Sequence, residues 1–173
     1  DQVGGHGAKF AANAFFGDYL YFGSYHQGTS AAYDKIMHKY CDEQQIESLC
    51  QLSDYDTQDI KSHREYMMKT WRAASIFRIK IEDILATNTP PKDKVELLYG
   101  KEKDWVFVPI KSPGSNIYDG YQFVMENNKL DQTPLFGDEG FGHQGMVYTF
   151  TFVEHDGKLF LGLWNATSGL FDM

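Results

Sequence analysis

The chain has 173 residues, a formal net charge of −8 and an aromatic share of 16%. This length is typical of one domain with a sizeable core, and the aromatic share argues against a disordered chain. The acidic balance argues against nucleic-acid and anionic-membrane surfaces, because phosphate groups are bound by clustered Lys and Arg. No uncharged apolar run approaches the roughly 20 residues of a membrane span, so no span is expected.

The N-terminal part of the chain is predicted to be helical. Residues 1–7 hold three glycines and are predicted to form a loose arm. In the next segment, Phe15, Tyr19 and Phe22 follow the i, i+4, i+7 spacing of a mostly buried helix. Polar residues that commonly begin helices predict three more, which start at Ser30, Asp42 and Thr57.

Beyond residue 75 the apolar period changes to that of β-strands. Phe77 and Ile79 alternate with charged residues, the pattern of a half-exposed strand. Further strands are predicted at Val95–Tyr99, Trp105–Ile110 and Tyr121–Met125. The last two strands, between Met146 and Trp164, are predicted to form a hairpin at Asp156-Gly157. A type I′ turn needs positive φ at both central residues, which Asp-Gly adopts readily.

The two-residue turn also predicts which side chains of this hairpin face each other. The expected pairs are Phe152–Leu161 and Phe150–Leu163 on one face, and Val153–Phe160, Thr151–Gly162 and Thr149–Trp164 on the other. The first face is expected to form a wall of the core. The second face, with a gap at Gly162, is expected to border a cavity or a partner.

The order of elements predicts an α+β fold, a single domain over residues 1–173. Its N-terminal helices would pack on a curved antiparallel sheet of about six strands. Lys39-Tyr40-Cys41 and Ser53-Asp54-Tyr55-Asp56 are similar to stretches in exported members of the NTF2-like and cystatin-like superfamily, and the element order resembles that group. The resemblance implies a curved sheet wrapped around a helix and, because such folds host many activities, says little about function.

The two cysteines bear on the compartment. On one continuous helix, nine residues separate Cys41 and Cys50 by about 13.5 Å, too far for a disulfide. A helix restart at Asp42, with Gln45 completing a capping box, would fold the two cysteines towards each other. A Cys41–Cys50 disulfide indicates a periplasmic or secreted protein, whereas two free thiols indicate a cytoplasmic one.

The long loop 131–145, with four glycines, is the predicted binding element. Loops of about 15 residues are uncommon in compact domains and are often binding loops or lids. It lacks a Walker lysine and precedes a strand, so it is not expected to bind phosphate. The candidate binding residues are Asp138, Glu139, Phe141, His143 and Gln144 of the loop, together with Trp164 of the hairpin.

Metal and catalytic motifs are absent from the sequence. The six histidines have no HxxxH or HxH spacing, so neither a metal nor another cofactor is expected. The hydrolase signatures GxSxG, SxxK and HExxH do not occur.

These observations favour a non-catalytic, extracytoplasmic binding domain that acts on a protein partner. An inhibitor or immunity-type protein that blocks an enzyme or toxin fits this description, and the acidic charge favours a basic partner. A second hypothesis is a small-molecule site in the concavity between helices and sheet. A third is a hydrolase in which His143 is the general base and Asp138 or Glu139 its partner.

Overall fold

The structure is a computed structural model that describes residues 8–26, 43, 46, 68–87, 89 and 92–166. The chain divides into two compact units, residues 1–27, 72–103 and 127–173 (unit 1) and residues 28–71 and 104–126 (unit 2). Each unit is considered by itself. The predicted 1–7 arm, Cys41, Cys50, the stretches that carry the family resemblance and most of the three later helices lie outside the described residues.

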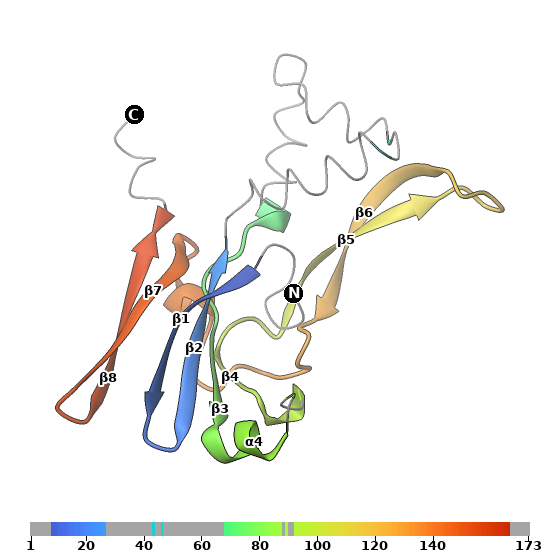
Figure 1. Ribbon diagram of the computed structural model, residues 1–173. Helices are drawn as coiled ribbons and strands as arrows, with labels where there is room; N and C mark the ends of the chain where they lie inside the picture. The colour runs from blue at the N-terminus through green and yellow to red at the C-terminus, as the bar shows by residue number, and fades with distance from the viewer. Residues whose placement is uncertain are drawn as a thin grey trace, which may run out of the picture. The chain divides into compact units, whose positions relative to one another are not determined.

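Unit 1 contains a six-stranded sheet with the strand order β4-β3-β2-β7-β8, in which β1 also pairs with β2 (Figure 1). The strands of unit 1 are β1 (Ala8–Phe16), β2 (Tyr19–His26), β3 (Ile76–Lys80), β4 (Glu96–Tyr99), β7 (Met146–His155) and β8 (Lys158–Asn165). The helical pieces are α4 (Ile81–Ala86) and the 3₁₀ turns η2 (Lys92–Lys94) and η3 (Glu139–Gly142). The described part of the chain is therefore mainly β.

The prediction of an α+β fold with N-terminal helices packed on the sheet is wrong. The segment assigned to the first helix forms the antiparallel hairpin β1–β2, in which Phe15 faces Leu20. Gly17 has φ 57 at the first central position of the two-residue turn, a conformation that favours glycine and reverses the chain tightly. Of the other predicted helices, only Glu43 and residues 68–70 are both described and helical.

One buried cluster of unit 1 lies on one face of β1 to β4. Phe77, Leu97 and Leu130 form a buried cluster, and Phe22 of β2 packs against it. The rings of Phe22 and Phe77 are stacked with centroids 5.3 Å apart. Besides β1, β2 has partners from two distant parts of the chain: Tyr19–Gly23 pair with β3, and Tyr25 pairs with Tyr148 of β7.

All six predicted strands are confirmed, as β3 to β8, and so is the turn of the last hairpin. Asp156 and Gly157 have φ 50 and 67, as a type I′ turn requires. The pairs Val153–Phe160, Thr151–Gly162 and Phe152–Leu161 are confirmed. Beyond Thr151 a bulge shifts the register by one residue, so the predicted pairs Phe150–Leu163 and Thr149–Trp164 are wrong; the pairs formed are Thr149–Leu163 and Tyr148–Trp164.

The β7–β8 hairpin contacts β2 closely at Gly23. A Cβ atom at Gly23 would lie 2.5 Å from Thr149 Cβ and would overlap the rest of that side chain. Thr149 is fully buried, and within the part of the chain that the structure describes its hydroxyl has no hydrogen-bond partner. The absence of a side chain at Gly23 therefore allows β7 to pack on β2.

In unit 2, β5 (Lys103–Lys111) and β6 (Tyr118–Asn127) form a two-stranded sheet whose first and last residues belong to unit 1. Phe107 stacks on Tyr121 with centroids 5.4 Å apart and meets Phe123 edge-on. The Lys69 ammonium lies 4.7 Å from the Trp105 ring centroid. Aromatic contacts thus hold this ribbon together. No helix in the described parts of either unit is long and apolar enough to cross a membrane.

Candidate binding surface

The predicted binding loop lies along the free edge of β4. Leu135 N–H donates to Leu97 O at 3.0 Å and Phe136 N–H to Leu98 O at 2.9 Å. Gly100 N–H donates to Gly137 O at 3.1 Å. The loop therefore continues the hydrogen bonding of the sheet, and its backbone is positioned like that of an additional strand.

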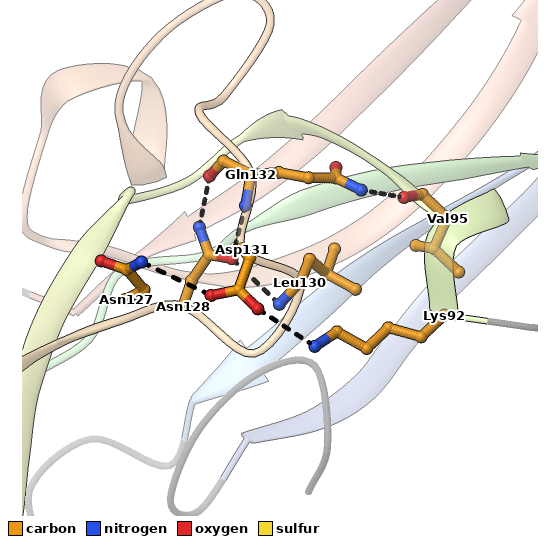
Figure 2. A network of polar contacts seen from close by, with 7 residues as sticks. All are labelled: Lys92, Val95, Asn127, Asn128, Leu130, Asp131 and Gln132. Atoms are coloured by element: carbon orange, nitrogen blue, oxygen red, sulfur yellow. Dashed lines mark hydrogen bonds and ion pairs between the residues drawn. The ribbon is translucent and has the colours of Figure 1, made fainter.

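Asn128 and Gln132 fix the start of the loop, as Figure 2 shows. The Asn128 side-chain oxygen accepts the N–H groups of Leu130 and Gln132, and its amide donates to Gln132 O at 2.5 Å. Gln132 in turn donates to Val95 O at 2.7 Å. These bonds hold the turn that inserts Leu130 into the core.

Glu139 anchors the other half of the loop. Its side chain is 4% exposed, and its carboxylate lies 2.8 Å from Lys101 Nζ and accepts the Ala73 N–H at 3.2 Å. Next to it, Gly140 N–H donates to Ala74 O at 2.7 Å. A buried carboxylate with these partners stabilises the loop and is not free to contact another molecule.

Three aromatic side chains, two from the loop and one from β4, form what we call the Tyr99 cluster: Tyr99, Phe136 and Phe141. The Tyr99 ring centroid lies 4.1 Å from that of Phe141 and 6.0 Å from that of Phe136. Phe136 is 63% exposed and Phe141 47%, and the neighbouring Leu135 is also exposed. The cluster presents apolar surface to solvent from a fixed backbone.

Phe141 has an unusual backbone conformation. Its φ of 57 and ψ of 38 fall in the left-handed region, which costs a bulky residue roughly 1–2 kcal/mol. The adjacent Gly140 has φ 59 without such a cost. Strained residues of this kind concentrate at functional sites, where the surrounding structure over-determines them.

The remaining predicted binding residues of the loop are not bonded to one another within the described part of the chain. Asp138, His143 and Gln144 are exposed. His143 Nδ1 accepts the Gly145 N–H at 3.0 Å, and within the described residues no carboxylate is bonded to this imidazole. The pairing of His143 with Asp138 or Glu139 that a general base would need is not formed. Among the described residues no group of His, Cys, Asp and Glu side chains could hold a metal ion.

Trp164 lies on a second exposed apolar surface, on the β7–β8 hairpin. It is 51% exposed and pairs with Tyr148, and Val153 and Phe160 pair farther along the same face. This is the hairpin face expected to border a cavity or a partner. Ala166, two residues after Trp164, donates its N–H to Gly145 O at 2.8 Å, so the end of β8 is tied to the end of the loop.

Sequence reasoning missed Tyr99 and Phe136. The signal for Phe136 was present, because Leu135-Phe136 is an apolar pair between Pro134 and Gly137 inside an otherwise polar loop. Tyr99 was assigned to a strand, but nothing in its own neighbourhood shows that the loop returns to it. That contact depends on backbone pairing between residues 35 or more positions apart.

Comparisons with known proteins give no further indication. No protein-family model matches the chain, and neither a curated protein nor a solved structure matches it. The geometry of the described residues is therefore the basis for the functional argument.

Proposed function

We propose that the chain is a non-catalytic binding domain that recognises a protein partner through the Tyr99 cluster and Leu135. The exposure of two phenylalanines on an anchored loop is the observation that carries this proposal. Aromatic side chains dominate the energetically important residues of protein interfaces, where they insert into pockets of the partner.

The anchoring of the loop supports recognition without a large ordering cost. Binding by a flexible loop loses the conformational entropy of every residue that becomes fixed. Here Glu139, Asn128 and the backbone bonds to β4 already fix the loop. The strained backbone of Phe141 also supports a binding role, because a conformation that lowers stability is retained where its geometry serves a function.

The charges of the domain support a basic partner. Asp138 is exposed beside the cluster, whereas Glu139 is neutralised by Lys101. With a net charge of −8, the domain would attract a basic partner over distances of about one Debye length, roughly 8 Å at physiological salt. The partner proposed is a protein with an apolar pocket flanked by Lys or Arg, such as an enzyme or toxin that the domain blocks.

The test is affinity capture from extracts of the source cells with immobilised protein. We expect the wild-type protein to retain one protein in stoichiometric amount, and Phe136→Ser or Phe141→Gly to lose it. Phe141→Gly removes the ring and also relieves the backbone strain, so its fold is expected to persist. Leu85→Ser is the matched control, because Leu85 is an exposed apolar residue of α4 and is not a member of the Tyr99 cluster. Capture that is absent, or equal for all four proteins, would refute the proposal.

An extracytoplasmic location belongs to the same proposal and is based on the sequence. It depends on the predicted Cys41–Cys50 disulfide. A thiol count on the denatured, unreduced protein tests it: no titratable thiol is expected, and two free thiols would favour the cytoplasmic alternative.

A further inference from the structure

The outer edge of β1 has no partner strand among the described residues. Within the described residues, β1 pairs only with β2. Phe16 and Tyr19 flank the two-residue turn and therefore form a hydrogen-bonded pair. By alternation Ala14 also bonds to β2, whereas the N–H and C=O groups of Asn13 and Phe15 point away from it.

The side chains along this edge are apolar and exposed. Phe10 is 66% exposed and Phe15 65%. Both lie on the core face of the sheet, because the register shift between Phe10 and Ala12 aligns Phe10 with Ser24 while Phe15 aligns with Leu20. The Phe10 ring meets Phe22 edge-on at 5.1 Å. The apolar core face thus continues outward and ends, uncovered, at β1.

Beyond Lys9, near its start, the strand lacks the features that protect free sheet edges. Natural edge strands often carry Lys or another charged residue, or Pro, and these residues prevent pairing with another strand. Residues 10–16 contain neither a charge nor a proline. By contrast, the edge of β4 is covered by the loop through Leu135 and Phe136, and β8 begins with Lys158 next to the turn.

We propose that β1 pairs with β1 of a second copy of the chain, antiparallel about a two-fold axis beside Ala14. In this register Asn13 of one copy lies opposite Phe15 of the other, and the same pair recurs on the far side of the axis. The outward main-chain groups then form four hydrogen bonds, and the two core faces join into one apolar surface.

The charge distribution of β1 is compatible with a second copy as the partner. In a two-fold pairing every residue near the axis meets itself or a close neighbour, so one charge in the strand would be opposed by a like charge. The uncharged segment from Phe10 to Phe16 meets this requirement. The β7–β8 hairpin contacts β2 through Gly23, on the opposite face of the strand from Phe22, so it leaves the Phe10 and Phe15 face open.

Sedimentation velocity over a protein concentration series tests the proposal. We expect a concentration-dependent dimer that strengthens with added salt, because salt screens the repulsion between two copies of charge −8. Asn13→Pro removes an outward N–H without removing a bond to β2, and Phe15→Lys places like charges near the axis. Each is expected to weaken the dimer at least tenfold. Phe160→Lys, at an exposed phenylalanine of β8, is the matched control and should dimerise like the wild type.

The register itself is tested by an additional variant. Residues at a non-hydrogen-bonded antiparallel pair have Cα atoms about 4.5 Å apart, within disulfide range. Mild oxidation of Ala14→Cys should therefore give a covalent dimer that the wild type does not form, and Phe10→Cys, several residues from the axis, should not. A wild-type protein that stays monomeric at all concentrations, a dimer unaffected by Asn13→Pro and Phe15→Lys, or no covalent dimer from Ala14→Cys would each overturn the proposal.

Discussion

Gly23→Ala is expected to destabilise unit 1 because the new methyl group has no room. The added Cβ would lie 2.5 Å from Thr149 Cβ, whereas ordinary carbon contacts are about 3.5–4.0 Å. A displacement of about 1 Å is therefore needed. Thr149 cannot supply it easily, since it is fully buried and β7 is held by the Ala74 N–H to Met146 O bond of 2.6 Å.

The size of the effect follows from two opposing contributions. Overpacking a well-packed core costs about 1–3 kcal/mol, and the close contact places this site near the upper end. Alanine also lowers the conformational entropy of the unfolded chain relative to glycine, and this effect raises the stability by about 0.4–1 kcal/mol. The net loss in the free energy of unfolding is expected to be about 2 kcal/mol, which corresponds to a decrease in Tm of roughly 4–8 °C.

Urea unfolding followed by tryptophan fluorescence measures this loss. Gly120→Ala in β6 is the matched control, because a Cβ there meets only Ile110 Cδ1 at 4.0 Å. In the double variant Gly23→Ala/Thr149→Gly the obstructing side chain is gone, so the two changes should couple by at least 1 kcal/mol. A free energy of unfolding for Gly23→Ala within about 0.5 kcal/mol of the wild-type value, which is on the order of the measurement error, would show that β7 does not pack closely on β2.

Three further substitutions test separate features by the same unfolding assay. Thr149→Val removes a buried hydroxyl without a partner and should stabilise by about 1 kcal/mol, and a loss of stability would contradict the absence of a partner. Glu139→Gln should cost about 2 kcal/mol and speed hydrogen exchange of the Gly140 amide, because Lys101 loses its carboxylate; unchanged exchange would show that this ion pair does not anchor the loop. Asp156→Val should cost at least about 1 kcal/mol at φ 50, whereas Asp156→Gly should be neutral; equal costs would exclude backbone strain as the cause.

The N-terminal hairpin shows why local periodicity misled the prediction. Phe15, Tyr19 and Phe22 have helical spacing, yet Tyr19, Tyr21 and Tyr25 also alternate as strand residues do. β2 has β1 on one edge and β3 and β7 on the other, and large side chains occupy both of its faces, so it lacks the alternation of polar and apolar residues that marks a half-exposed strand. The Gly17-Asp18 dipeptide was the decisive local signal.

The C-terminal hairpin was predictable because its turn is defined by two residues. Asp156-Gly157 sets the register up to Thr151, and the register then shifts at a bulge that no local pattern marks. The bulge depends on tertiary contacts, since Thr149 must be turned onto Gly23.

The loop 131–145 shows the same difference between local and long-range signals. Its length and glycine content indicated a functional element, and Phe141 is indeed exposed. The role of Glu139 could not be predicted from the loop sequence. Its carboxylate is bonded to Lys101 and to the Ala73 N–H, which lie 38 and 66 positions earlier in the chain. Whether a carboxylate is a ligand or an anchor is decided by residues distant in sequence.

The pairing of β2 also determines when the sheet of unit 1 can be completed during translation. Tyr25 and its partner Tyr148 are 123 positions apart. At about 5–20 residues per second, β2 leaves the ribosome roughly 6–25 s before that partner is made. β3 and β4 are made within this interval and can pair with the first part of β2, but the Tyr25 end of β2 still lacks its partner strand. The chain therefore depends for several seconds on whatever shields this apolar segment at the ribosome exit.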